Sequence, residues 1–357
     1  MKGLIKNILL ISLTFLVLLA ILEFAVRAGP HSACYIYSEG MFEQDEQLCY
    51  KLVPNFEGEL ASPAEYRITV NTNSMGFRNE EIGEKEKDRI LIAGDSFALG
   101  VGVEQEETFS ALLGKQLVDY EVINVGVPSY ETWREKVYLQ NNKLEPDIVI
   151  LAFFHNDING NENENICMSN VRKGYLVNDN YANMPLPLFN LRIFLNTKAE
   201  SYCMLKDNAL NIKSRLTKRE LEPAIQGSLL TYFTKEPYKG KTAENWNTTK
   251  RLLKETAEVV KESGSEFIIL IIPDKFQVEE DSWKPLTERY GITSKDFDME
   301  KLNRLIKEFG EESSITVIDP LPQLREAEEK VYYDFDRHFN EKGNKIVSEV
   351  IYEQLKS

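Results

Sequence analysis

The sequence predicts an α/β fold in which helices cover both faces of a mostly parallel, five-stranded sheet, preceded by one transmembrane helix. Three observations support this prediction. Strand-like and helix-like segments alternate over most of the chain, the strand-like runs are apolar on both faces, and one long uncharged run lies near the N-terminus. The 357 residues, 43% hydrophobic and 28% charged, suit a large folded domain with additions and exclude a wholly disordered chain.

Residues 1–28 are predicted to anchor the protein in a membrane. The run Ile8–Leu22 carries no charge, and Lys2 and Lys6 precede it. With the next turn included, it reaches the ~20 residues that a bilayer-spanning helix needs. Basic residues on its N-terminal side predict a cytoplasmic N-terminus and an extracytoplasmic remainder. Cleavage after Ala28, as in a signal peptide, is the alternative, because small residues suit such sites.

The charge balance restricts the partners of the chain. It has 42 Lys and Arg residues against 57 Asp and Glu residues, a formal net charge of −15. Nucleic-acid binding requires clustered basic residues that neutralise phosphates, so nucleic acid is not an expected partner. The same balance disfavours an anionic lipid surface as the main partner and makes a strongly anionic substrate less natural.

Four cysteines follow the predicted anchor: Cys34, Cys49, Cys167 and Cys203. An even number outside the cytoplasm permits two disulfides. Proximity in the sequence favours Cys34–Cys49 and Cys167–Cys203, but all three pairings and free buried thiols stay open. The spacing of these cysteines does not resemble a zinc site.

The region after the anchor begins without a clear pattern. Residues 29–65 have few periodic apolar positions, and we expect an irregular entry segment there. Tyr66–Val70 alternates apolar and polar residues, and Asn73–Gly76 is a turn signal, so a hairpin is expected at this point. The main domain is therefore predicted to span residues 66–357.

A regular alternation of strands and helices begins near residue 89. Short apolar runs predict five strands: Arg89–Gly94, Glu121–Val125, Asp147–Phe154, Phe267–Ile272 and Ile315–Asp319. Helical spacing and a capping box predict four helices: one over Phe109–Leu117, one starting at Thr132 with Glu135, one over 246–263 and one over Ile346–Leu355. Residues 159–245, rich in Asn, Pro and Tyr, are interpreted as an insertion or cap. Right-handed crossovers then predict a three-layer, flavodoxin-like domain with strand order 2-1-3-4-5.

Polar motifs stand where this fold would bind a ligand, since open α/β sheets bind outside the carboxyl ends of their strands. Four motifs follow strands or precede the last helix: Gly94-Asp95-Ser96, Asn124-Val125-Gly126, His155-Asn156-Asp157 and Asp336-Arg337-His338. They supply a serine, possible amide donors, and a histidine with a nearby carboxylate. We therefore expect these motifs to face one crevice and to perform chemistry together.

These motifs resemble those of the SGNH/GDSL hydrolases, named for their Ser, Gly, Asn and His. The first stands here as GDSFALGVGV, and the resemblance runs from about residue 66 to the C-terminus, the insertion excepted. Two features depart from the pattern. The acid lies two residues before His338, where many members place it three before, and His155 stands where a small residue or Pro is common. The Asp-x-His-Phe-Asn form resembles the branch that includes exported polysaccharide O-acetyltransferases.

The resemblance implies a role for each residue and no cofactor or metal. Ser96 would be the nucleophile, His338 its base and Asp336 the residue that orients the base. The oxyanion would be held by the backbone N–H groups of Ser96 and Gly126 and by the side-chain amide of Asn156. Asp95 would fix the turn before the serine. His155 and Arg78 are further candidates for the pocket.

The expected function is acyl-ester hydrolysis outside the cytoplasm through an acyl-enzyme intermediate. If a sugar hydroxyl replaced water, the protein would instead be an O-acyltransferase of cell-surface or secreted polysaccharide. A glycan-binding protein with an inactive site is an alternative of another class. A metal-dependent phosphoesterase is a weaker one, with these ligands: Asp95, His155, Asp157, Asp336 and His338. The acyl group, the acceptor and the oligomeric state stay open.

Overall fold

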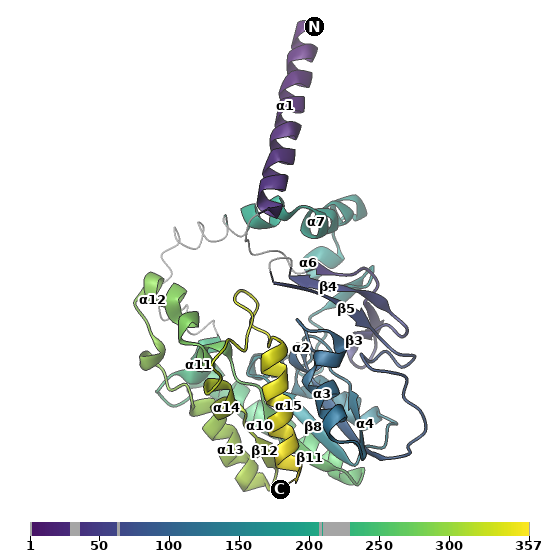
Figure 1. Ribbon diagram of the computed structural model, residues 1–357, viewed down its shortest axis with the longest axis vertical. Helices are drawn as coiled ribbons and strands as arrows, with labels where there is room; N and C mark the ends of the chain where they lie inside the picture. Colours follow the sequence, from purple (N-terminus) through teal and green to yellow (C-terminus); the bar gives the residue numbers. More distant parts are fainter. Residues whose placement is uncertain (1, 29–35, 63–64, 207–208, 210–228, 357) are drawn as a thin grey trace.

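The computed structural model describes residues 2–28, 36–62, 65–206, 209 and 229–356, and it shows one long helix outside an α/β body (Figure 1). The central sheet has five strands in the order β12-β11-β8-β6-β7, all parallel to their neighbours. They are β6 (Asp88–Gly94), β7 (Tyr120–Asn124), β8 (Ile148–Phe153), β11 (Glu266–Ile271) and β12 (Thr316–Ile318). In chain order this is the predicted 2-1-3-4-5 arrangement, which the structure confirms.

Helices cover both faces of this sheet because the strands bury apolar side chains on both sides. Leu91 and Leu151 face a core that includes Leu253 of α10 (Gly240–Glu262), with α4 (Thr132–Asn141) and α13 (Lys301–Ser313) on the same face. On the other face, the core includes residues of α3 (Phe109–Gln116), α14 (Leu321–Arg325) and α15 (Glu341–Lys356).

The predicted capping box of α4 is wrong. The helix begins at Thr132 with Glu131 as its N-cap, and no side chain caps it. The Thr132 hydroxyl instead donates to Oδ2 of Asp157 (3.2 Å), and neither carboxyl oxygen of Glu135 has a hydrogen-bond partner among the described residues. The reason is burial: this first turn of α4 packs against the segment after β8 rather than facing water.

The expectation of an irregular segment over 29–65 also differs from the structure, because its described part holds four short strands. These are β1 (Ile36–Tyr37), β2 (Phe42–Asp45), β3 (Cys49–Leu52) and β4 (Glu57–Ser62). β2 pairs with β3, and β4 pairs with both β1 and β5 (Tyr66–Asn71). β5 is thus the strand that was predicted, but its hairpin partner precedes it in the sequence. Strands this short bury too few side chains each to show a period.

The disulfide pairing favoured by proximity is wrong, because Cys49 of β3 is bonded to Cys167. Cys203 is disulfide-bonded as well, and Cys34 lies outside the described residues. Proximity fails here because the insertion folds back onto the first strands. Its hairpin of β9 (Asn170–Arg172) and β10 (Tyr175–Val177) packs beside β2 and β3.

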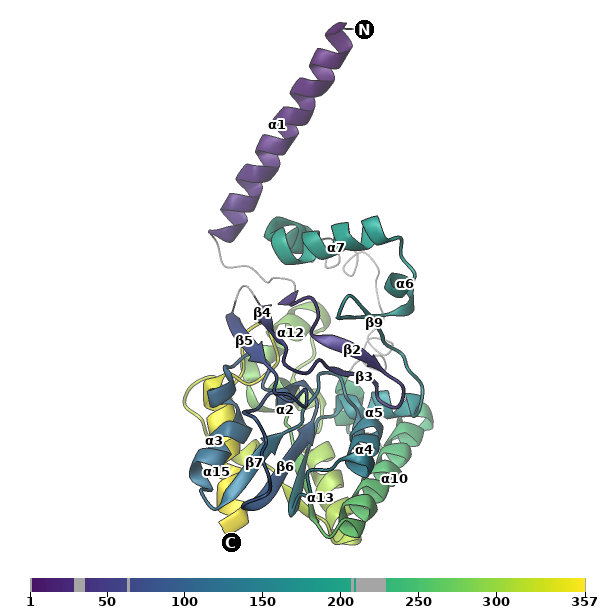
Figure 2. The ribbon, with the colours of Figure 1, turned by 90° about the vertical axis from the view of Figure 1, so that its right-hand side faces the viewer.

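Helix α1 (Lys2–Arg27) is the one described helix that is long and apolar enough to cross a membrane. The 25 residues Gly3–Arg27 would extend about 37 Å, more than the ~30 Å of a hydrocarbon core. Figure 2 shows helix α7 (Leu186–Lys198) of the insertion lying crosswise near the end of α1. The remaining elements are α2 (Ser96–Leu99), α5 (Asn156–Gly160), α6 (Asp179–Ala182), α11 (Lys275–Val278), α12 (Lys284–Tyr290) and short 3-10 turns at Gln105–Glu107, Asn161–Asn163, Leu229–Phe233, Glu280–Trp283 and Ser294–Asp296.

Candidate active site

A continuous chain of hydrogen bonds joins Ser96, His338 and Asp336. Ser96 is the first residue of α2, directly after β6, whereas the other two lie in the loop before α15. The Ser96 Oγ is 2.7 Å from Nε2 of His338, and Nδ1 of His338 is 2.5 Å from Oδ1 of Asp336. The structure therefore brings together three residues that the sequence separates by up to 242 positions.

The turn before Ser96 is fixed by Asp95 and a glycine. One carboxyl oxygen of Asp95 accepts from the Phe97 N–H (2.9 Å), and the other accepts from the Asn156 side-chain amide (3.0 Å). Burial raises the pKa of Asp95. Gly94 has φ +151°, and a Cβ there would lie 2.9 Å from the Cβ atoms of Ala98 and Ala152, so α2 can start this close to the sheet only at a glycine.

Asp336 is held by two residues that sequence analysis did not single out. The Tyr66 hydroxyl donates to Oδ2 of Asp336, and the Asp336 backbone N–H donates to the Glu65 carboxylate (2.7 Å). Tyr66 is the first residue of β5 and Glu65 precedes it, so the first strands of the body support the site from outside the central sheet. The alternation of Tyr66–Val70 indicated a strand, but no sequence signal placed that strand beside Asp336.

The expected oxyanion donors are not equally available. The Ser96 backbone N–H has no hydrogen-bond partner in the part of the chain that is described, and the Asn156 amide spends one of its two hydrogens on Asp95. The Gly126 N–H, however, donates to Oδ1 of Asn124 (2.9 Å). We expected the Gly126 N–H to be available to the oxyanion, but the side chain of Asn124, two residues earlier, already accepts it.

One backbone N–H near Gly126 is free instead. Val127 donates to the Gly94 carbonyl, Tyr130 donates to the Val127 carbonyl, and Pro128 has no N–H. Among residues 126–130, only Ser129 has a backbone N–H without a partner in the described structure. Ser129 is exposed and has φ +62°. The Pro-Ser pair is a turn signal that could have drawn attention to it.

Arg78 does not reach the site with a free guanidinium. It is 2% exposed, and it donates to four backbone carbonyls: those of Thr69, Leu99, Gly100 and Val103. Burial lowers its pKa to about 10. A buried cation needs such partners to replace water, and here they fasten the loop that follows α2. Arg78 was expected to line the pocket, but its role in the structure is to hold this loop in place.

His155 likewise fills space rather than lining an open pocket. It is 1% exposed, and its Nε2 lies 2.6 Å from Oδ2 of Asp274. The same carboxyl oxygen accepts from Arg337, the residue between Asp336 and His338. Burial by itself would raise the pKa of Asp274, but the Arg337 guanidinium and His155 hold it well below its usual range. This cluster fastens the loop that carries His338.

Two further carboxyl groups are buried, those of Glu135 and Asp157, and the carboxyl group of Glu131 is half-buried; the charge of Asp95 acts on all three. Burial raises the pKa of each, and the charges of neighbouring carboxylates add to the effect for Glu135 and Asp157. In the described residues, no three His, Cys, Asp or Glu side chains are placed to hold one metal ion.

A flavodoxin-like sheet with a linked serine, histidine and aspartate at its carboxyl edge defines the class: an SGNH-type α/β hydrolase fold. The chain belongs to the GDSL-like lipase/acylhydrolase family, whose model matches residues 92–346. The resemblance inferred from the sequence is thereby confirmed, and the protein is an ester-acting hydrolase by family.

Solved structures of this class are similar to the chain at low identity. TesA is 13% identical, covers 75% of this chain and 98% of its own, and has a TM-score of 0.41. A catalytic mutant of Axe2, an acetylxylan esterase from Geobacillus stearothermophilus, is 13% identical, covers 77% and 96%, and scores 0.40. A putative lipolytic protein from Desulfitobacterium hafniense is 14% identical, covers 75% and 99%, and scores 0.37. Comparison with curated proteins gave no match.

Proposed function

We propose that the protein is a serine-dependent acyl-ester hydrolase with Ser96 as nucleophile. The observation that supports this most is the geometry of the hydrogen bonds, 2.7 Å from Ser96 Oγ to His338 Nε2 and 2.5 Å from His338 Nδ1 to Asp336. Serine is a weak nucleophile until a base removes its proton, and imidazole can do so near neutral pH. Asp336 fixes the tautomer with the proton on Nδ1 and stabilises the imidazolium that forms.

The reaction then proceeds in two halves. Ser96 Oγ attacks the ester carbonyl carbon, and its proton passes to His338 Nε2. Collapse of the tetrahedral intermediate breaks the bond to the alcohol, which leaves with that proton, and the acyl group stays on Ser96. Water attacks the acyl-serine in the same way, with His338 as base, and releases the acid.

The oxyanion of each intermediate needs donors that are already oriented. We assign this role to the Ser96 N–H and to the second amide hydrogen of Asn156, with the exposed Ser129 N–H as a further unpaired donor in the loop after β7. The first and third have no partner in the described structure, and the Asp95 carboxylate holds the Asn156 amide in place. Gly126 keeps a supporting role, because a Cβ there would lie 2.5 Å from the Leu99 backbone nitrogen.

We further propose that the body of the protein lies outside the cytoplasm, with α1 as an uncleaved, single-pass anchor whose N-terminus is cytoplasmic. Lys2 and Lys6 before the apolar run support this orientation. The Cys49–Cys167 disulfide supports it independently, because such bonds persist in oxidising compartments. We take residues 66–357 as the catalytic domain with its insertion at 159–245, and residues 36–62 as strands that complete it.

In the second half-reaction, the acyl acceptor can be water or another hydroxyl group. A sugar hydroxyl in place of water would make the protein an O-acetyltransferase of surface or secreted polysaccharide, and the Asp336-Arg337-His338-Phe339-Asn340 motif resembles that branch. Hydrolysis is the simpler proposal, since it needs no second binding site.

The experiment compares the full chain in nanodiscs with two variants. Ser96→Ala should reduce acetyl-ester turnover by about four orders of magnitude or more. Ser263→Ala, at the end of α10 and far from the site in the fold, should leave turnover unchanged. Turnover retained in Ser96→Ala would refute the serine mechanism. Transfer exceeding hydrolysis when an oligosaccharide is added would favour the transferase, and glycan binding without turnover would favour the inactive binding protein.

A further inference from the structure

We propose that helix α7 lies in the headgroup region of the membrane that α1 spans, so that the protein binds the bilayer through a second surface. The lipid-contacting surface is defined by Leu188, Leu191 and Phe194. The inference rests on the proposed anchoring by α1 and goes beyond it, because a single spanning helix would leave the body free to pivot.

The first argument is the exposed apolar face of α7. Leu188, Leu191 and Phe194 follow one another at three-residue spacing, and they are 55%, 52% and 59% exposed. Phe189, on the opposite side, is 1% exposed and packs under the Arg172 guanidinium at 4.4 Å. An exposed apolar face on a helix that is anchored by its other side marks an interaction surface, and a membrane is one partner that such a face fits.

The second argument is charge. The residues Leu186–Lys198 include two basic side chains, Arg192 and Lys198, and no acidic one. This is unusual in a chain with a net charge of −15. Lipid phosphates attract basic side chains, so α7 suits a headgroup region better than the remaining surface does.

The third argument is the junction with α1. The Glu23 carboxylate accepts hydrogen bonds from the Glu200 N–H (3.0 Å) and the Ser201 N–H (2.9 Å), and Arg27 donates to the Lys198 carbonyl (2.8 Å). The last turn of a spanning helix lies at the boundary of the hydrocarbon. The C-terminal end of α7 is therefore held at the same depth, and Figure 2 shows α7 running crosswise to α1 from that point.

The fourth argument is that α7 is firmly attached to the body. Arg172 of β9 donates to the carbonyls of Tyr181, Ala182 and Met184, just before α7. The β9–β10 hairpin is itself held by the Cys49–Cys167 disulfide and by the Gly40 N–H, which donates to the Lys173 carbonyl (3.1 Å). A bilayer contact at α7 would thus fix the tilt of the whole body. The carboxyl edge of the sheet, where α2 begins, lies on the side nearer α1 (Figure 2).

The test uses tryptophan as a depth probe in the full chain. The native residues Trp133, Trp246 and Trp283 are buried and provide a constant background. We would introduce Leu191→Trp or Phe194→Trp and reconstitute each protein in phosphatidylcholine vesicles brominated near the headgroup end of the acyl chains. Bromine quenches tryptophan on contact. In brominated vesicles, the tryptophan emission of both variants should fall by more than that of wild type. In vesicles without bromine, the emission maximum of the introduced tryptophan should lie at a shorter wavelength than that of a water-exposed tryptophan.

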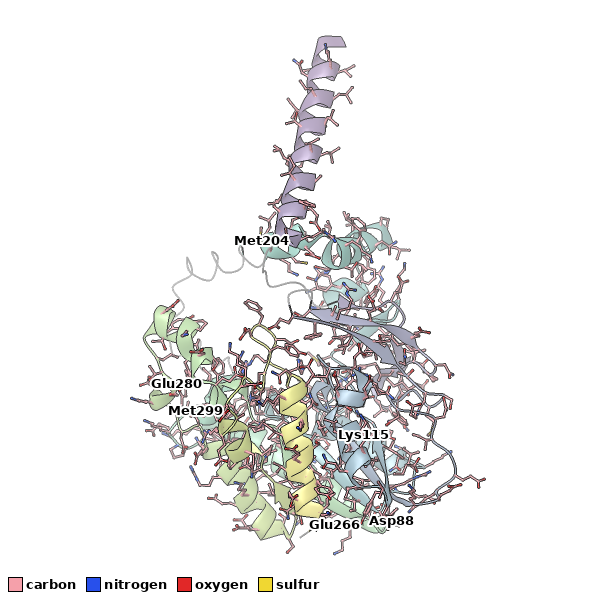
Figure 3. All side chains as sticks on the ribbon, in the orientation of Figure 1. Asp88, Lys115, Met204, Glu266, Glu280 and Met299 are labelled. Atoms are coloured by element: carbon pink, nitrogen blue, oxygen red, sulfur yellow. A yellow bond between two sulfur atoms is a disulfide. The ribbon has the colours of Figure 1, made fainter. Side chains whose placement is uncertain are left out.

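Two further variants separate the possible failures. Phe24→Trp, on α1 and 77% exposed, tests the anchor alone. Val118→Trp is the control for a tryptophan far from the membrane. Val118 is 66% exposed and lies two residues before Tyr120, which pairs with Asp88. Figure 3 shows Asp88 and Glu266 at the end of the body away from α1, whereas Met204 lies at the foot of α1.

Quenching of Leu191→Trp and Phe194→Trp well above Val118→Trp supports the proposal. Quenching of Phe24→Trp with neither α7 variant above Val118→Trp overturns it and leaves the anchor intact. No quenching of Phe24→Trp refutes the anchor and the proposal together. Because the two α7 variants are independent, misfolding of one leaves the other to decide.

Discussion

The Tyr66 hydroxyl donates a hydrogen bond to Oδ2 of Asp336, while Oδ1 of the same carboxylate faces His338. The two residues are 270 positions apart, and Tyr66 comes from β5, outside the central sheet. The strands that precede the α/β body therefore reach the candidate site and hold the carboxylate that faces His338.

Tyr66→Phe should reduce kcat by about tenfold with little change in KM, because a lost hydrogen bond to a charged group costs roughly 1.5–3 kcal/mol and this bond acts through the orientation of His338. Steady-state kinetics on an acetyl ester measure the effect. The matched control is Tyr333→Phe, which removes a hydroxyl that donates to the Gly102 carbonyl from a ring 4.9 Å from that of Tyr66. Equal kcat values for wild type and Tyr66→Phe would show that the hydrogen bond from Tyr66 to Asp336 does not contribute to turnover.

Asn156→Ala should reduce kcat by about 10²–10³, the usual effect of removing one oxyanion donor. Ser129→Gly should remain active, because glycine keeps the backbone N–H and accepts φ +62°. Single-turnover rates of ester acylation distinguish the two. If Asn156→Ala acylated as fast as wild type, the Asn156 amide would not be an oxyanion donor.

Asp274→Asn should lower the free energy of unfolding by about 3–5 kcal/mol at neutral pH, because it breaks the buried pair of Asp274 with His155 and also removes the ion pair with the partly exposed Arg337. The folded-state pKa of Asp274 is depressed, so its stabilisation is present above the unfolded value of about 3.9 and is lost as the pH falls further. The difference between variant and wild type should shrink below about pH 4 in urea titrations.

The exposed pair of Asp281 and Lys284 provides the comparison for this experiment. Asp281→Asn should unfold like wild type at neutral pH, since surface ion pairs contribute little. A similar loss in both variants would mean that the buried cluster around Asp274 has no special role.

Glu135→Gln should stabilise the protein at alkaline pH. Burial raises the pKa of Glu135, so the folded protein holds a proton that the unfolded chain releases above about pH 4.3. The free energy of unfolding therefore falls as the pH rises toward the folded-state pKa. The neutral amide removes this loss and can donate to Oδ1 of Asp157, which has no partner among the described residues. We expect a gain of about 1–3 kcal/mol near pH 9 by denaturant unfolding.

Glu255→Gln is the control, because Glu255 is paired with Lys136 (2.6 Å) and Arg251 (2.7 Å) and should gain nothing from neutralisation. Loss of stability in Glu135→Gln at high pH would show that Glu135 is ionised in the folded protein.

The central sheet and the positions of Ser96, His338 and Asp336 could be predicted because both signals are local. Each strand contains a short run of apolar residues, and each motif follows a strand or precedes the last helix. Parallel topology then brings the motifs to one edge without further information.

The parts that sequence analysis missed depend on contacts between distant segments. Tyr66 meets Asp336, and Cys49 meets Cys167, because segments far apart in the sequence pack against each other in the folded chain. Gly126 was expected to serve the oxyanion, but the orientation of the Asn124 side chain occupies its N–H, and no spacing rule reveals such an orientation.

The most direct test of the account is covalent labelling of the full chain with a fluorophosphonate, followed by mass spectrometry of its peptides. A phosphonyl adduct on Ser96, absent from Ser96→Ala and slowed in Tyr66→Phe, is the predicted result. An adduct on another serine, or none on Ser96 in protein that hydrolyses esters, would contradict the assignment of Ser96 as nucleophile.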